Sequence, residues 1–395
     1  MTGKSAAALL LFIAYASVTW SEPRILNLAI GDSERRNRQV LVYLDTIVDT
    51  RRNDILSAQA LLQRLDKSRL ILIAEEHTNL SHHQVQLRVL ELAQEAGRPL
   101  MIGLEMFPAS DQRVLDDWTA GSLRESEFIE QADWYGGWGY DWDYYRDIFL
   151  FARANNVPMM ALNASRDLVA EVRSEGLSAV RQRRNAELPP IVAPSSSDYR
   201  TLISSFFATD DSVHGALPEE QMNALLEAQS TWDAVMAYTA STTLAAYPER
   251  TLVVLAGTGH VAYELGIARQ IGQWVEGPVT TIVPVAVGET ATEVRASLGD
   301  FIWGVPSVTD PDFPSLGTVT TSSDGSLRII HVEPESPADL GGLEAGDVLS
   351  SLHGRPVSDK RQLNQAVAAL EWGDEIVAII QRDGVERSLT VKLRR

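Results

Sequence analysis

Residues 70–77, Leu-Ile-Leu-Ile-Ala-Glu-Glu-His, join a continuous apolar run to three ionisable side chains. Four aliphatic residues in a row, without polar alternation, are typical of a strand that is buried on both faces of a sheet. The segment therefore predicts a central strand that delivers carboxylates and an imidazole to its carboxyl end.

Similar apolar runs recur along the chain, and patterns typical of amphipathic helices separate them. The further runs are residues 100–104, 158–162, 252–255 and 281–285. The longest helical pattern covers residues 221–245. Such alternation indicates an α/β fold, with a parallel sheet and helices on both of its faces.

Polar side chains follow four of these runs. They are Glu75 and His77 after the first run, Glu105 after the second, Asn163 after the third and His260 after the fourth. In an open parallel sheet, ligands bind outside the carboxyl ends of the strands. These side chains therefore predict one shared site, and the alternative is that they cap the helices that follow.

A divalent metal ion is one ligand that this set of side chains could hold. Two imidazoles and two carboxylates suit zinc, manganese or iron, with Glu75, His77, Glu105 and His260 as the candidate ligands. In a hydrolase, Glu75 or Glu105 would act as the general base on a metal-bound water. The neighbouring His82 and His83 are interpreted as surface or supporting groups.

Aromatic side chains are densest in residues 134–145, Trp-Tyr-Gly-Gly-Trp-Gly-Tyr-Asp-Trp-Asp-Tyr-Tyr. The glycines disfavour a buried helix, so we expect several rings to be displayed from a loop. Flat rings suit a planar ligand, and a tyrosine phenolate can bind ferric iron. The candidate binding residues are Trp138, Tyr140, Tyr145 and Asn163, with Arg166 as a partner for a ligand carboxylate. The alternative is that the rings merely hold this segment on the core.

Taken in order, these motifs resemble the ChaN-like haem-binding uptake family, within the Tiki metalloprotease and erythromycin esterase-like superfamily. The resemblance covers residues 45–287, with its motifs at 74–77, 103–107, 138–142, 161–163, 229–236 and 256–260. It implies a haem-binding protein of bacterial iron uptake. It also implies that Glu75, His77, Glu105 and His260 correspond to the polar centre of the superfamily's hydrolases. Ala74 departs from the family, whose turn usually begins with glycine.

Residues 314–395 resemble a bacterial PDZ domain, a small β-rich α+β fold, after a linker at residues 309–313. The signature is Ser-Pro-Ala-Asp-Leu-Gly-Gly-Leu at residues 336–343, followed by Gly346-Asp347-Val348-Leu349. Leu316, Gly317 and Thr318 correspond to the loop that holds a peptide C-terminus. The resemblance implies a peptide or a periplasmic protein as partner. The alternative is a module that packs on the first domain and binds nothing.

Charge and cysteine content exclude several classes of protein. A formal charge of −19 disfavours nucleic-acid and anionic-membrane partners, which require clustered Lys and Arg. The chain has no cysteine, so it forms no disulfide and carries no lipoprotein anchor. It therefore differs from the many members of the resembled family that are lipoproteins.

The first residues have the features of an export signal. The apolar run at residues 6–18 is shorter than the ~20 residues that a spanning helix needs. Ala14-Tyr15-Ala16 matches a signal-peptidase site. We therefore expect a signal peptide at 1–16, a ligand-binding domain at 17–308, a periplasmic or secreted location and no stable membrane anchor. The alternative is an uncleaved N-terminal anchor.

Three functions are consistent with these features. The first is an exported haem- or iron-binding protein whose PDZ module binds a protein partner. The second is a metal-dependent hydrolase that uses the strand-end carboxylates and imidazoles. The third is an interaction scaffold whose site is idle.

Cleavage is expected after Ala16, because the A-x-A pattern directly follows the apolar run. N-terminal sequencing of protein recovered from cells should therefore read Ser17 as the first residue. An intact Met1 in the membrane fraction would show an uncleaved anchor instead.

Overall fold

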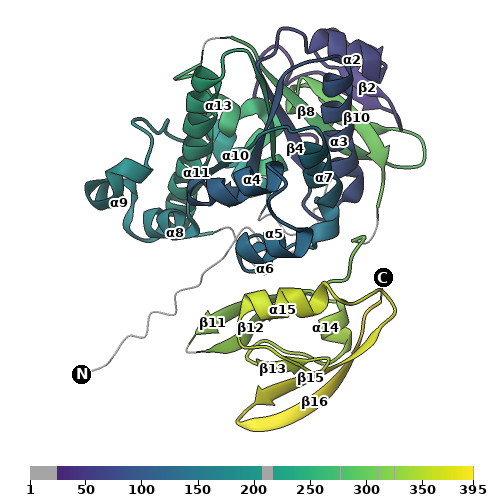
Figure 1. The fold of residues 1–395 in the computed structure, drawn as a ribbon, viewed down its shortest axis with the longest axis vertical. Helices are drawn as coiled ribbons and strands as arrows, with labels where there is room; N and C mark the ends of the chain where they lie inside the picture. The colour runs from purple at the N-terminus through teal and green to yellow at the C-terminus, as the bar shows by residue number, and fades with distance from the viewer. Residues whose placement is uncertain (1–24, 207–216, 276, 309–310, 324, 395) are drawn as a thin grey trace. The chain divides into compact units, whose positions relative to one another are not determined.

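The computed structural model describes residues 25–206, 217–275, 277–308, 311–323 and 325–394. The expected signal peptide at residues 1–16 lies outside these ranges. The chain divides between Asp310 and Pro311 into two compact units, each with its own sheet (Figure 1).

The first unit is built on an eight-stranded sheet in the order β3-β2-β10-β8-β4-β7-β5-β6. From β10 to β6 all neighbouring strands are parallel, whereas β2 and β3 are antiparallel. The strands are β2 (Ile47–Asp49), β3 (Asp54–Leu56), β4 (Leu70–Glu75), β5 (Leu100–Pro108), β6 (Met159–Asn163), β7 (Thr251–Gly257), β8 (Val279–Val287) and β10 (Phe301–Pro306). The parallel sheet predicted from the apolar runs is confirmed, with a short antiparallel edge added to it. A separate two-stranded pair joins β1 (Gln39–Val42) to β9 (Thr292–Arg295).

Helices cover both faces of this sheet. The connections through α3 (Leu80–Glu95) and α7 (Arg146–Ala154) run in one direction along the sheet. Those through α11 (Glu219–Ala246) and α13 (Ile267–Ile271) run back. Right-handed crossovers therefore put the two groups on opposite faces, as Figure 1 shows for α3 and α11 on either side of β4. None of the described helices, α11 of 28 residues included, is long and apolar enough to cross a membrane.

The first unit contains twelve described α-helices. The helices are α2 (Ala58–Arg64), α3 (Leu80–Glu95), α4 (Gln112–Thr119), α5 (Glu125–Gln131), α6 (Trp134–Gly137), α7 (Arg146–Ala154), α8 (Arg166–Glu175), α9 (Leu177–Arg184), α10 (Ser197–Ser205), α11 (Glu219–Ala246), α12 (Thr258–Val261) and α13 (Ile267–Ile271). The predicted helix at 221–245 thus forms as α11, whereas only the short α12 and α13 follow β7.

Most rings of the aromatic segment point into the core. Trp134, Trp138, Trp142, Tyr144 and Tyr145 are all buried, so the expectation that several rings are displayed is wrong for these five. The segment turns inward through α6 and a 3-10 turn at 142–144, and two of its indoles donate hydrogen bonds to protein acceptors. The Trp134 Nε1 donates to the Tyr140 carbonyl at 2.8 Å and the Trp142 Nε1 to Glu125 at 2.9 Å.

The second unit is an antiparallel sheet in the order β11-β12-β13-β15-β16, with β14 paired to β13. Its elements are β11 (Thr318–Ser323), β12 (Ser326–Val332), α14 (Pro337–Leu340), β13 (Val348–Leu352), β14 (Arg355–Pro356), α15 (Lys360–Val367), β15 (Glu375–Arg382) and β16 (Val385–Lys392). A core of its own, which includes Leu327, Ile376 and Val391, lies between the sheet and the helices. The predicted β-rich α+β domain is therefore present.

Candidate functional site

The carboxyl ends of three adjacent strands bring the predicted side chains together around Gly257. Glu75 at the end of β4 is in register with Gly257 at the end of β7. The Gly257 N–H donates to Glu105 Oε2 at 2.6 Å. A Cβ on Gly257 would lie 3.0 Å from His77 Cε1 and 3.5 Å from Glu105 Oε2. The absence of a side chain on Gly257 therefore lets an imidazole and a carboxylate approach the same point of the backbone.

Glu75 is buried and accepts three side-chain hydrogen bonds. His77 Nδ1 and the Tyr145 hydroxyl contact its Oε1 at 2.7 and 2.5 Å, and Gln86 Nε2 donates to its Oε2 at 2.7 Å. Burial alone would raise the pKa of Glu75, but the positive potential of His83 and the donors at its oxygens lower this pKa to about 2. Glu75 is therefore ionised at neutral pH, and its oxygens position other side chains.

The bond to Glu75 also fixes the His77 ring. Because an ionised carboxylate can only accept, His77 Nδ1 must carry the proton. No described residue forms a hydrogen bond with His77 Nε2, whose side chain is 21% exposed. Burial lowers the pKa of His77, but the bond to Glu75 and the charges of Glu75 and Glu105 raise it above its ordinary value. A metal that binds at Nε2 must therefore displace a proton in acidic solution.

His260 bridges two carboxylates. Its Nδ1 contacts Asp233 Oδ1 at 2.6 Å, and its Nε2 lies 3.2 Å from Glu105 Oε1. Burial would lower the pKa of His260, but the charges of Glu105 and Asp233 raise it to about 10. Asp233, on α11, also accepts a hydrogen bond from the Tyr199 hydroxyl. Asp233 belongs to the motif at residues 229–236, but the sequence did not predict its contact with His260. The two residues are far apart along the chain, and only tertiary packing brings α11 to the turn after β7.

The four candidate metal ligands thus form two carboxylate–imidazole pairs. An imidazolium that donates from both nitrogens has no lone pair for a metal ion. Metal binding by all four side chains would therefore require His260 to lose a proton and turn away from Glu105. Within the described ranges, no group of three or more His, Cys, Asp or Glu side chains is arranged to hold a metal ion.

The other strand-end residues support this centre. Asn163 donates through Nδ2 to the Glu105 carbonyl and accepts from the Ala164 N–H at 2.7 Å, so it shapes the ends of β5 and β6. His82 and His83 are both 2% exposed and therefore not surface groups. His83 Nδ1 lies 3.2 Å from Gln86 Oε1, which helps to orient the amide toward Glu75.

Aromatic rings surround the exposed side of His77. The Trp138 ring lies edge-on at 4.7 Å between centroids, and the Tyr140 ring lies at 4.9 Å. Tyr140 is half-buried, whereas Tyr145 is completely buried against Glu75. Arg166 is exposed at the start of α8, and its guanidinium lies 3.4 Å from the Gly136 carbonyl. Of the two predicted tyrosines, Tyr140 is therefore the one beside the exposed side of His77. We call His77, Trp138 and Tyr140 the rim of the site.

A further indole lies on the other side of the centre. The Trp232 ring is 5.3 Å from the His260 ring, and its buried Nε1 has no hydrogen-bond acceptor in the described structure. A buried donor without an acceptor is costly, which makes this N–H a candidate contact for a ligand. The sequence offered no sign of this role, because Trp232 is far from the aromatic segment along the chain.

Comparison with known proteins assigns both units. Residues 61–271 match the family described as haem-binding uptake, Tiki superfamily, ChaN, and the chain belongs to this family. Residues 314–393 match the PDZ domain. The solved structure of ChaN of Campylobacter jejuni with cofacially bound heme has a TM-score of 0.51 and 17% identity, and the match covers 65% of this chain and 95% of that chain. The resemblance inferred from the motifs is confirmed, and at this identity the structure supports the fold alone.

Curated relatives match over short stretches. A probable periplasmic DegP-like serine endoprotease of Ectopseudomonas mendocina is 35% identical over 65 residues, which are 16% of this chain and 14% of that protein. Human serine protease HTRA3 is 26% identical over 117 residues, which are 30% of this chain and 23% of that protein. The chain therefore spans less than a quarter of the length of these relatives.

The His260 pair predicts a specific pH dependence of stability. The pKa of His260 is raised from 6.5 to about 10 in the folded protein, so protonation of His260 stabilises the fold. This contribution to the unfolding free energy is complete below pH 6.5 and is lost as the pH rises toward 10. The loss in unfolding free energy caused by His260→Gln should therefore be greater near pH 6 than near pH 10, by at least ~1 kcal/mol. Urea denaturation of both proteins across this range, with EDTA present, measures the difference. The exposed His331→Gln is the control, and an equal loss at every pH would contradict the pairing.

Proposed function

We propose that the protein binds haem at the rim formed by His77, Trp138 and Tyr140, and that it serves bacterial iron uptake as an exported protein. The observation that carries this proposal is the His77 ring, whose Nδ1 is held by Glu75 while its Nε2 has no hydrogen-bond partner in the described structure. Proteins that bind haem hold its iron through an imidazole nitrogen or a tyrosine oxygen, and His77 and Tyr140 would offer one of each.

The chemistry of the rim suits this ligand. A carboxylate that holds one imidazole nitrogen fixes the ring and increases the basicity of the other nitrogen. Haem, when bound, would supply an iron that accepts a nitrogen or oxygen ligand. Trp138 and Tyr140 offer ring surface beside His77, and the unpaired Trp232 Nε1–H and the exposed Arg166 are donors for carboxylate groups.

Family membership and the N-terminal sequence support the wider role. The ChaN protein of C. jejuni binds heme cofacially, and we propose the same class of ligand for this chain. The apolar run and the A-x-A site at residues 14–16 support export to the periplasm. The PDZ module would then connect the haem-binding unit to a protein partner in that compartment.

Removal of the Tyr140 hydroxyl tests the haem site. Tyr140→Phe retains the ring but removes the oxygen, so haemin should bind about 10-fold more weakly, a change of ~1.4 kcal/mol, with a shifted Soret band. Haemin titration followed by visible absorbance measures both. Tyr247→Phe is the control, because this tyrosine is 44% exposed at the end of α11.

The possible outcomes distinguish whether haem binds at all from which side chain binds its iron. Wild-type-like binding by Tyr140→Phe together with weakened binding by His77→Gln would assign the iron to His77. A wild-type titration that never saturates, or that matches nonspecific uptake by albumin, would contradict haem binding altogether.

The second unit has the features needed to bind a peptide C-terminus. Among the described strands β11 pairs with β12 alone, so it is an edge strand whose outer edge can accept an added strand. Gly317, directly before β11, has φ +70°, and a Cβ there would lie 2.3 Å from Ser336 Cβ. Gly317 is therefore required both by its backbone conformation and by the close approach of Ser336, the N-cap of α14. We infer that Leu316, Gly317 and Thr318 hold the carboxylate of a peptide partner.

Gly317→Val should abolish capture of C-terminal peptides, because a branched side chain moves this loop away from Ser336. Fluorescence polarisation with a C-terminal peptide library measures binding, and circular dichroism checks that the domain still folds. Leu340→Ala, at a residue that is 64% exposed on α14, is the control. A folded Gly317→Val protein with unchanged peptide binding would exclude this loop as the carboxylate site.

A further inference from the structure

A cavity of about 720 Å³ lies at the amino ends of β4 and β8, the end of the sheet opposite to Glu75 and Gly257. Ser68 and Lys67 precede β4, and Pro278 precedes β8, so the cavity is separate from the haem-binding rim. Its wall combines charged groups with apolar surface from Val279 and Phe301. Such a mixture is typical of sites for small organic ions.

Positive charge is in excess on this wall. The lining contains five cationic side chains against three carboxylates, in a chain whose net charge is −19. The cations are Arg51, Arg52, Arg64, Lys67 and Arg269. The cations of the wall therefore outnumber its carboxylates by two. The carboxylate oxygens already contact protein groups.

The engagement of the carboxylates is specific. Asp49 accepts from the backbone N–H groups of Arg51 and Arg52 at 3.1 and 3.0 Å. Asp300 contacts Arg51 Nε at 2.8 Å, and Glu264 contacts the buried Arg35 at 2.6 Å. Asp49 also pairs with Arg64 through Oδ2, whereas none of the three carboxylates pairs with Arg52 or Lys67 in the described structure.

Three cations lack a complete set of partners. No described carboxylate lies within ion-pair distance of Arg52 or Lys67. Arg64 forms ion pairs at 3.5 Å with Asp49 through Nη1 and with Asp54 through Nη2, but its buried Nη1 has no hydrogen-bond acceptor in the described structure. A buried guanidinium N–H without an acceptor is unfavourable unless a ligand supplies one.

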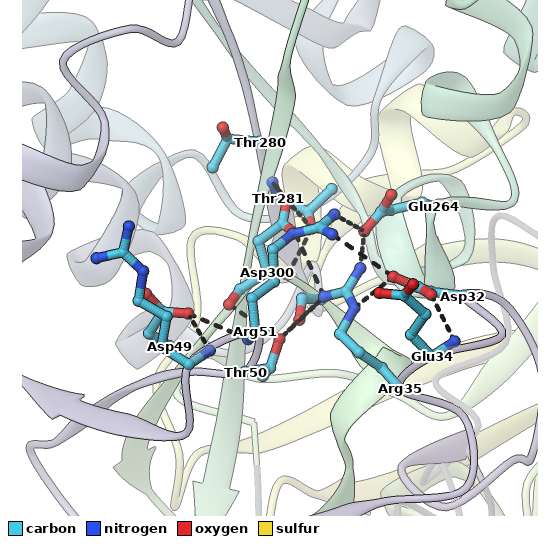
Figure 2. Close-up of polar contacts among 12 residues, drawn as sticks. Asp32, Glu34, Arg35, Asp49, Thr50, Arg51, Glu264, Thr280, Thr281 and Asp300 are labelled. Carbon is cyan, nitrogen blue, oxygen red and sulfur yellow. Dashed lines mark hydrogen bonds and ion pairs between the residues drawn. The ribbon is translucent and has the colours of Figure 1, made fainter.

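A rigid network fixes the wall behind these cations. Figure 2 shows the guanidinium groups of Arg35 and Arg51 among Asp32, Glu264 and Asp300. Arg35 is 3% exposed and contacts all three carboxylates, whereas Arg51 is 55% exposed. Arg35 thus neutralises the inner carboxylates and Arg51 stands at the cavity.

We propose that this cavity binds the phosphoryl group of a small molecule through Arg52, Arg64 and Lys67. The planar guanidinium of arginine matches the geometry of phosphate oxygens, and lysine supplies a mobile point charge. Arg52 and Lys67, which have no carboxylate partner in the described structure, would supply two positive charges to a phosphoryl dianion. The apolar wall at Val279 and Phe301 suits the organic part of a phosphate monoester, and inorganic phosphate is the other source of the same group.

Calorimetric titration of the full chain tests this site, at constant ionic strength and without phosphate buffer. The probes are inorganic phosphate, glucose 6-phosphate and, as a carboxylate of similar charge, citrate. The wild type should bind a phosphate probe saturably. Tighter binding of glucose 6-phosphate identifies an ester as the ligand, and tighter binding of inorganic phosphate identifies the free ion. The double variant Arg52→Gln/Lys67→Gln should bind at least ~10-fold more weakly, since two of the cations are lost.

Two controls make the result decisive. Arg113→Gln removes a cation that is 93% exposed on α4, outside the cavity wall, and should bind phosphate as the wild type does. Haemin titration of the double variant should be unchanged, which shows that the unit remains folded. Arg64→Gln tests the buried nitrogen separately and should also weaken binding. Absence of saturable binding, citrate binding equal to phosphate binding, or unchanged binding by the double variant would each overturn the proposal.

Discussion

The buried carboxylate of Glu75 is the contact on which the arrangement of the site depends. It joins the end of β4 to α3 through Gln86, to the following turn through His77 and to the aromatic segment through Tyr145. A buried charge is tolerated only where partners compensate its lost hydration, and these three donors do so. These contacts all meet on one carboxylate. They therefore fix the positions of the His77 imidazole and the aromatic segment relative to the end of β4.

A second buried acid repeats this arrangement on the other side of Gly257. Glu105 accepts from the Gly257 N–H and lies beside His260, whose other nitrogen contacts Asp233 on α11. The chain thus connects helices on both faces of the sheet to its carboxyl end through buried carboxylates, Glu75 for α3 and Asp233 for α11. Loss of one partner in such a pair costs more than the pair contributes, because the remaining charge stays buried.

The sequence predicted the parts of the structure that follow from local patterns. Continuous apolar runs predicted the parallel strands, because a strand buried on both faces needs no alternation. The runs did not predict β2 and β3, which are three residues each and carry too little pattern to recognise. Gly136, Gly137 and Gly139 suggested displayed rings, but a one-turn helix and a 3-10 turn direct five rings of this segment inward. Asp233 was missed as a partner of His260 because their contact depends on tertiary packing.

The hydrogen bonds within the site determine which of its side chains can still contact a ligand. Glu75 has three donors, Glu105 is held by a backbone N–H and His260 has a carboxylate at each nitrogen. A general base must have an oxygen or nitrogen that is free to take a proton, and these groups are committed to one another. His77 differs, because its ring is fixed through Nδ1 while Nε2 stays unbonded in the described structure. The position of this nitrogen is set before a ligand arrives, which suits the iron ligation proposed above.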